Sequence, residues 1–197
     1  MDIVNKTNKE TYNVIASKYV LEAEKDHTQK KYINNFINTF KGNKILDLGC
    51  GTGILAKYLN DLGYDVTGID FSKEMLKIFK ETAPNSNALL WDVMDIDKIN
   101  NKFNGIIATH LLVHFNKEQI LELFEKIKKI MTQDSSFFIQ FVPYLPDGLQ
   151  IEPLNEAYKL YRYSYDIAII KELLIKSGYD TIYEDTSNIT TIIAKSM

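Results

Sequence analysis

One segment of the chain restricts the possible folds more than any other. Residues 44–63 read KILDL, then GCGTG, then ILAKYLNDLG. The first run predicts a buried strand, and the last predicts a helix that ends near Gly63. Glycine tolerates positive φ and lets a ligand approach the backbone closely. A glycine-rich turn between a strand and a helix therefore predicts a ligand-binding loop in an α/β fold.

The rest of the chain continues this alternation. Apolar runs at 65–70, 88–91, 103–110 and 135–142 predict strands, and helical spacing at 117–131 and 167–176 predicts helices. Ser72 is the expected N-cap of a further helix. This alternation predicts an open, mostly parallel sheet with helices on both faces. The two last runs, 179–184 and 189–195, are joined too closely for a crossover and predict an antiparallel hairpin.

Two regions lie outside the alternating pattern. One is a helical stretch at residues 1–40, and the other is a Pro- and Tyr-rich insertion at residues 143–166. In open α/β sheets the ligand binds beyond the carboxyl ends of the strands. We therefore expect a single domain over residues 1–197, with 1–40 as a helical lid and 143–166 near the site of a second substrate. The tyrosines of the insertion are candidates to line that site, and Arg162 to pair with an acidic substrate.

Composition narrows the function classes. The 197 residues carry a formal net charge of −3, which gives no reason to expect a nucleic-acid partner. The single cysteine, Cys50, excludes a disulfide within the chain. The polar start MDIVNKTNKE has no signal-peptide core, and no apolar run reaches the roughly 18 residues of a membrane span. We expect a cytoplasmic protein without a membrane partner, as a monomer or a homodimer.

Three carboxylates follow the predicted strands and indicate the ligand. Asp47 stands two residues before the first glycine, so a pyrophosphate here would cost roughly 1 kcal/mol or more and a cationic ligand is favoured. The glycine spacing also differs from the dinucleotide pattern, whose third glycine position holds Ile54. Asp70 ends the second strand, where a carboxylate accepts ribose hydroxyls. Asp92 follows the third strand and is placed to accept an adenine amino group.

The segments LDLGCGTG, GIDFS and WDVMD, in this order and spacing, resemble the class I S-adenosylmethionine-dependent methyltransferases over about residues 10–195. The resemblance implies a Rossmann-like open seven-stranded sheet in the order 3-2-1-4-5-7-6, with strand 7 antiparallel. It implies that Asp70 holds the ribose. The remaining implied contacts are Asp47, Gly49, Gly51 and Gly53 for the methionine part, and Asp92 and Val93 for the adenine. Phe71 and Val93 are candidates to cover the two adenine faces. Cys50 lies within the glycine loop of the cofactor site, where it is expected to be a small packing residue.

Two further segments are similar to the small-molecule branch of this family. The stretch TYNVIASKY resembles one whose tyrosines cap the donor site, which implies Tyr12 and Tyr19; Asn13 stands where an aspartate is usual. The end of the fourth strand, THLLVH, adds Thr109 to the cofactor site. His110 and His114 in this segment are the candidate general bases. Their i, i+4 spacing also suits a metal, but no third ligand is apparent and no metal site is expected.

The resemblance implies transfer of a methyl group from S-adenosylmethionine to a small-molecule acceptor, leaving S-adenosylhomocysteine. The signature of amino methyltransferases acting on DNA or protein is absent after the fourth strand, where THLL stands. Three alternatives stay open: a regulatory module that binds the donor without turnover, an NAD(P)-dependent oxidoreductase, and a non-methylating use of the same donor. The sequence does not identify the acceptor.

Overall fold

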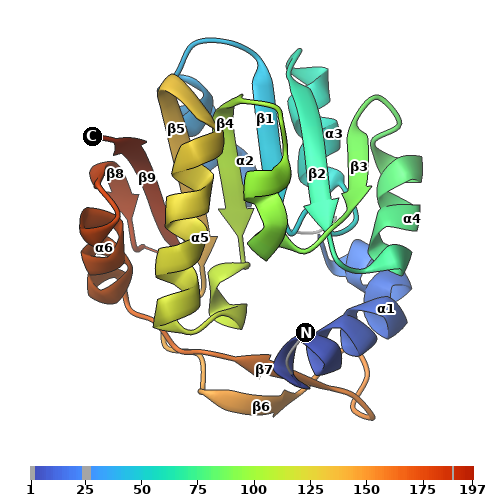
Figure 1. The fold of residues 1–197 in the computed structure, drawn as a ribbon. Helices are drawn as coiled ribbons and strands as arrows, with labels where there is room; N and C mark the ends of the chain where they lie inside the picture. The colour runs from blue at the N-terminus through green and yellow to red at the C-terminus, as the bar shows by residue number, and fades with distance from the viewer. Residues whose placement is uncertain (1–2, 24–27, 188) are drawn as a thin grey trace.

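The seven-stranded sheet of the computed structural model runs in the order β3-β2-β1-β4-β5-β9-β8 (Figure 1). The structure describes residues 3–23, 28–187 and 189–197. The predicted strand order is confirmed, with the last two strands renumbered because the insertion adds a separate two-stranded sheet, β6-β7. The bounds of the strands are Lys44–Leu48 for β1, Asp65–Asp70 for β2, Asn87–Leu90 for β3, Phe103–Thr109 for β4, Met131–Phe141 for β5, Gly148–Ile151 for β6, Lys159–Arg162 for β7, Tyr179–Asp185 for β8 and Thr190–Ser196 for β9.

The register of the sheet brings the ends of three strands together. Strand β1 pairs in parallel with β2 and β4, and Asp47 lies opposite Gly68 on one side and Ile107 on the other. Strand β9 is antiparallel to both β5 and β8, as the C-terminal hairpin predicted. The loops after β1, β2 and β4 therefore leave the sheet at one edge, the carboxyl edge, where ligands of such sheets bind.

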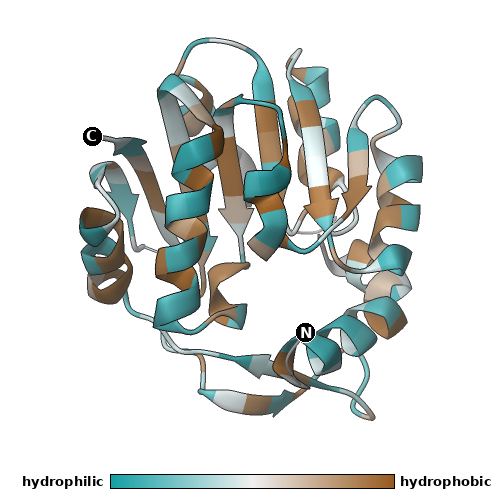
Figure 2. Cartoon of the chain, in the orientation of Figure 1, coloured by the Kyte–Doolittle hydropathy of each residue, from teal (hydrophilic) through white to brown (hydrophobic). Residues whose placement is uncertain are grey.

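Helices cover both faces of the sheet, and each strand contributes alternate side chains to two cores. On β5, Phe137 packs toward α5 (Lys117–Ile130) and α6 (Ile167–Lys176), whereas Phe138 packs toward α2 (Thr28–Ile37), α3 (Ile54–Asp61) and α4 (Lys73–Thr82). In Figure 2 the apolar strands lie between helices of mixed hydropathy. The predicted N-cap of α4 is confirmed, because Ser72 Oγ accepts a hydrogen bond from the backbone of Met75 at 3.2 Å.

The N-terminal helix α1 (Ile3–Ala23) lies below the carboxyl edge with the β6–β7 hairpin beside it (Figure 1). Two short 3₁₀ helices, η1 (Val93–Lys98) and η2 (Leu112–His114), follow β3 and β4. Thr11 Oγ1 of α1 donates to the backbone oxygen of Lys159 in β7 at 2.6 Å. None of the helices in the described part of the chain is long and apolar enough to cross a membrane.

Within the range 1–40, for which the sequence predicts one helical lid, the structure has two helices, α1 and α2, in different surroundings. Helix α2 is part of the core, because Tyr32, Ile33 and Phe36 are buried against the sheet. Helix α1 instead contacts α4 and the hairpin. The expectation of a lid therefore applies to α1 alone, and there it stays a prediction.

Candidate ligand site at the carboxyl edge

A pocket with two adjoining lobes lies between α1 and the carboxyl edge. The lobes share four lining residues and therefore adjoin each other. The first lobe is lined by Tyr12, Tyr19, Gly49, Gly51, Asp70, Phe71, Met75, Thr109, His110, Leu111 and His114. The second lobe is lined by Asn5, Asn8, Gly49, Phe71, Asp92, Val93, Leu111, His114 and Phe115. Most of the residues predicted from the sequence are thus brought together here.

Gly49 and Gly51 of the glycine loop after β1 line the first lobe. Gly51 has φ of 51°, in the left-handed region, and lines the pocket, which leaves its backbone open to a ligand. Gly53 lies elsewhere: it is the N-cap of α3, and a Cβ there would come within 2.7 Å of the Phe79 ring. Gly53 thus allows close packing of the loop against α4, and its predicted contact with a cofactor stays a prediction.

Asp47 is a buried acid without a complete set of partners. It is 1% exposed, and its Oδ1 has no hydrogen-bond partner among the described residues. Burial, together with the nearby charge of Asp70, raises the pKa of the Asp47 carboxyl to about 8. The residue is therefore protonated at neutral pH unless a cation or hydrogen-bond donor reaches it.

Asp70 joins two sides of the first lobe. Its Oδ2 accepts a hydrogen bond from the backbone of Gly51 at 3.0 Å, and its Oδ1 accepts from the backbone of Ser72 at 2.8 Å. Burial raises the pKa of Asp70 to about 6, while these backbone donors act in the opposite direction. Asp70 thus holds the loops after β1 and β2 together and lines the pocket that they form.

The second lobe contains the third predicted carboxylate. Asp92 is the N-cap of η1, and its Oδ1 accepts from the backbone of Met94 at 3.0 Å. Asp92 and Val93 line this lobe, and Phe71 lines both lobes. The carboxylates that follow β2 and β3 therefore face different halves of one pocket, with an aromatic ring common to both.

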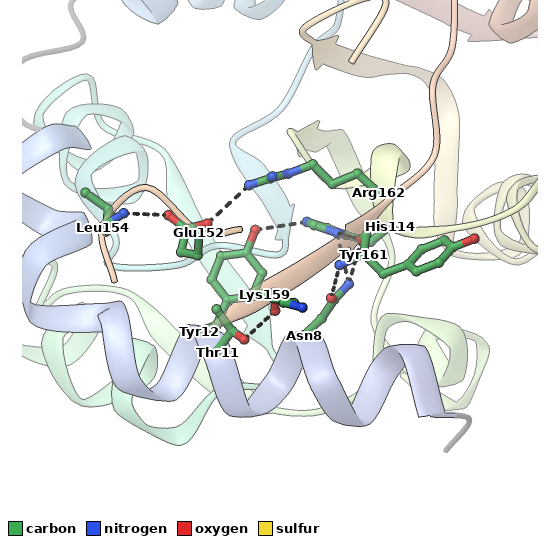
Figure 3. Close-up of polar contacts among 9 residues, drawn as sticks. All are labelled: Asn8, Thr11, Tyr12, His114, Glu152, Leu154, Lys159, Tyr161 and Arg162. Atoms are coloured by element: carbon green, nitrogen blue, oxygen red, sulfur yellow. Dashed lines mark hydrogen bonds and ion pairs between the residues drawn. The ribbon is translucent and has the colours of Figure 1, made fainter. Parts of the chain in front are cut away.

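His110 and His114 both line the first lobe, but in different settings. His110 has φ of 54°, and its backbone donates to Gln140 at 2.7 Å. In His114 both ring nitrogens meet protein groups: Nε2 lies 2.9 Å from Tyr12 Oη, and Nδ1 lies 3.2 Å from Asn8 Nδ2 (Figure 3). Burial lowers the pKa of His114 to about 4, so the ring is neutral at pH 7.

Tyr12 closes the first lobe from α1. Its ring meets Tyr19, Phe71 and His114 edge-on, with centroid separations of 6.2, 6.1 and 5.6 Å. Burial raises the pKa of the Tyr12 hydroxyl well above its usual range, which keeps it protonated. The next residue, Asn13, accepts a hydrogen bond from Ser72 Oγ at 2.7 Å, so this departure from the family's aspartate still ties α1 to α4.

Several predicted site residues lie outside the two lobes, among them the buried Asp47, which lines neither. The Cys50 side chain is buried in the core shared with α2 to α4, and burial raises the pKa of its thiol. Tyr144 is 75% exposed, and Tyr165 Oη donates to the backbone of Phe115 at 2.6 Å. Arg162 pairs with the buried Glu152 at 3.3 Å. The tyrosine-rich insertion therefore lines neither lobe, and its arginine is already neutralised.

Helix α1 contributes two residues that the sequence analysis did not single out, Asn5 and Asn8. Both line the second lobe. They precede Tyr12 by seven and four positions, and Tyr19 follows it by seven. These spacings place all four residues on one face of a helix. The periodicity around Tyr12 was the signal that could have found them. Met75, Leu111 and Phe115 were missed because apolar residues in such positions are typical of any core.

No group of three metal-binding side chains is found among residues 3–23, 28–187 and 189–197. No lysine or arginine lines either lobe in this part of the chain. A phosphorylated ligand would therefore meet the carboxylates of Asp70 and Asp92 without a lysine or arginine to balance them, which disfavours a dinucleotide.

Known proteins resemble the chain in sequence and in fold. Residues 45–134 match a family model described as a methyltransferase domain. A putative methyltransferase, YqeM, of Bacillus subtilis is 26% identical over 122 residues, which cover 59% of this chain and 44% of that protein. An uncharacterized methyltransferase of Alkaliphilus oremlandii is 26% identical over 176 residues, covering 89% of this chain and 77% of that protein. The chain thus spans less than half the length of the Bacillus subtilis relative.

Among solved structures, DhpI in complex with SAH superposes with a TM-score of 0.75. The match covers 98% of this chain and 97% of DhpI, at 16% sequence identity. At that identity the likeness establishes the fold, which agrees with the strand order described above.

Proposed function

We propose that this chain, which belongs to the class I S-adenosylmethionine-dependent methyltransferases, binds S-adenosylmethionine in the two-lobed pocket and transfers its methyl group to a small-molecule acceptor. S-adenosylhomocysteine is then the product. The proposal includes the expected cytoplasmic location and leaves open whether the chain acts as a monomer or a homodimer.

The observation that carries the proposal is the unpartnered Oδ1 of Asp47, the acid that precedes the glycine loop and interacts electrostatically with the pocket-lining Asp70. A buried carboxyl without a partner is costly, and a cation relieves that cost by ionising it. S-adenosylmethionine carries an ammonium and a sulfonium and no phosphate. The second buried acid, Asp70, raises the pKa of Asp47 through its charge, and Asp70 itself lines the first lobe. This electrostatic setting supports a cationic nucleoside ligand.

The two lobes suit the two halves of that ligand. In the first lobe we assign the methionine part to the loop of Gly49, Cys50 and Gly51, with Tyr12 and Tyr19 above it. Asp70 is assigned to the ribose hydroxyls, and Thr109 also lines this lobe. In the second lobe Asp92 and the Val93 backbone are assigned to the adenine, with Phe71 against its ring.

The sulfonium supplies an activated methyl group, so the main task of the chain is alignment. Orientation of two reactants contributes roughly 7–11 kcal/mol to such a step. His110 and His114, which both line the first lobe, are assigned as the candidate bases for an acceptor that must lose a proton. Enclosure of the pocket beneath α1 supports a small acceptor.

Calorimetric titration tests the proposal directly. S-adenosylhomocysteine is expected to bind with a micromolar Kd, and NAD⁺ and NADP⁺ are expected not to bind. Asp70→Asn and Asp92→Asn should each weaken binding at least tenfold, whereas Asp97→Asn, the matched change at a third acid of the same region, should not. Binding of a nicotinamide nucleotide in place of S-adenosylhomocysteine would overturn the proposal. Donor binding without transfer to any acceptor in a screen would instead favour a regulatory module.

A further inference from the structure

The side chain of Asn8 connects α1 to both β7 and the pocket. Its Oδ1 accepts from the backbone N–H of Tyr161 at 2.7 Å, and its Nδ2 donates to the backbone oxygen of the same residue at 3.0 Å (Figure 3). This pair of contacts fixes the orientation of the Asn8 side-chain amide, because the backbone of Tyr161 offers one donor and one acceptor. The second hydrogen of Nδ2 is left to face His114 Nδ1 at 3.2 Å.

This arrangement selects one tautomer of His114. An amide nitrogen is only a donor, so Nδ1 must accept, and the ring hydrogen resides on Nε2. In the other tautomer the Nδ1–H of His114 would point at the Nδ2–H of Asn8. The backbone oxygen of Tyr161 accepts from Asn8 and keeps a second lone pair 3.3 Å from Nδ1, so it is the acceptor that Nδ1–H would use in that other tautomer. Nε2–H then donates to Tyr12 Oη, 2.9 Å away.

The tautomer decides where the hydroxyl hydrogen of Tyr12 points. Because Oη accepts from His114, its own hydrogen must be donated to another group, and Tyr12 lines the first lobe opposite Gly51 and Asp70. We propose that Asn8 is a positioning residue that, through the tautomer of His114, directs the Tyr12 hydroxyl hydrogen toward a lone pair of the ligand in the first lobe. The nature of that ligand rests on the proposed function; the tautomer does not.

The same contacts couple this orientation to the position of α1. Asn8 reaches Tyr161 only when α1 lies against β7, where Thr11 Oγ1 also donates to Lys159. Thr11 has no contact with His114 among its described hydrogen bonds, although it holds the same two elements together. Thr11→Val is therefore a matched control that removes a neighbouring hydrogen bond between α1 and β7 and leaves Asn8, the donor that faces Nδ1, in place.

Two substitutions of Asn8 test the tautomer in the ligand-free protein. In Asn8→Asp a carboxylate faces Nδ1 and draws the ring hydrogen onto it, so Nε2 must accept from Tyr12. Asn8→Ala removes the N–H donor that faces Nδ1 and leaves the backbone oxygen of Tyr161 to accept from Nδ1–H, with the same result. Long-range ¹H–¹⁵N spectra of ¹⁵N-histidine-labelled protein distinguish the protonated ring nitrogen from the non-protonated one. The signals that are absent from His114→Gln are those of His114.

We expect the wild type and Thr11→Val to show Nε2–H, and both Asn8 variants to show Nδ1–H. Circular dichroism melts establish that each variant is folded, and either Asn8 variant suffices if the other is not. An Nδ1–H form in the wild type, or an unchanged pattern in a folded Asn8 variant, would overturn the proposal.

Titration with S-adenosylmethionine and S-adenosylhomocysteine tests the orientation of the hydroxyl. Tyr12→Phe should weaken binding of at least one of them about tenfold, the equivalent of one hydrogen bond. The same substitution should have less than a twofold effect in the Asn8→Asp background and the full effect in the Thr11→Val background. Equal effects in all three backgrounds would contradict a role through His114. If the wild type binds neither ligand, the proposed function fails, whereas the tautomer result stands by itself.

Discussion

At the scale of single residues, the buried carboxyl of Asp47 is electrostatically unfavourable in the ligand-free protein. The carboxyl sits near Asp70 with an unpartnered oxygen, and its pKa is raised to about 8 from an ordinary value of 3.8. Such a group binds a proton more tightly in the folded protein than in the unfolded chain. Linkage then requires that the stability of the fold change with pH between these two values.

We predict that the ligand-free protein loses stability as the pH rises from about 4 to about 8, because only the unfolded chain releases the Asp47 proton freely in that window. Asp70, whose pKa is raised to about 6, adds a smaller loss at the lower end. Asp47→Asn should flatten the dependence and stabilise the protein near pH 8. Urea unfolding at several pH values measures both effects. A slope that Asp47→Asn leaves unchanged would show that this carboxyl is ionised or partnered in the fold.

Residues that belong to a local motif were predictable from the sequence, and those that act across elements were not. Asp70 and Gly51 follow strands in a spacing that fixes their position at the carboxyl edge. Asn8 carries no such signal by itself, because a polar residue in a helix is usually solvated. Its importance depends on the backbone of Tyr161, which is 153 positions away in the chain, and no local pattern encodes that contact.

At the scale of elements, local signals fixed the helices and strands of the alternating part. The helix expected at residues 167–176 is confirmed as Ile167–Lys176, because an aspartate cap and an apolar face define it. The hairpin β6–β7 was not predicted. Leu149 and Ile151 of β6 are exposed, so the alternation of its side chains does not mark a core. Burial of α2 was missed because the sequence shows the apolar face of that helix but not the surface against which it packs.

Gly68 in β2 shows how closely the elements of the site approach one another. A Cβ at this position would lie 2.7 Å from both Cys50 Sγ and the Phe79 ring. Gly68→Ala should destabilise the fold by about 1–3 kcal/mol through overpacking, measured by urea unfolding. Cys50→Ala removes one of the two obstacles, so the double variant should lose less than the sum of the single changes. Additive losses would mean that the thiol does not limit this packing.

At the scale of the whole molecule, α1 is attached differently from the other helices. The sheet and its flanking helices share two large apolar cores, whereas α1 contributes Ile15 and Ala16 to a small separate cluster with Met75. Its other ties include hydrogen bonds of Asn8 and Thr11 to β7 and of Asn13 to Ser72. The Tyr12 ring adds edge-on contacts with Phe71 and His114. Opening of α1 therefore exposes much less apolar surface than global unfolding does, and it costs correspondingly less free energy.

Hydrogen exchange followed by mass spectrometry tests whether α1 moves as a unit. Amides of residues 3–23 should exchange faster than those of β4 and β5, because a local opening that leaves both cores intact suffices to expose them. Thr11→Val should accelerate exchange in α1 and leave the strands unchanged. Saturating S-adenosylhomocysteine should slow exchange most in α1, since Tyr12 and Tyr19 line the pocket from that helix. Protection of α1 equal to that of β4 would mean that the helix opens only when the whole domain unfolds, and a ligand would then have to enter past the β6–β7 hairpin instead.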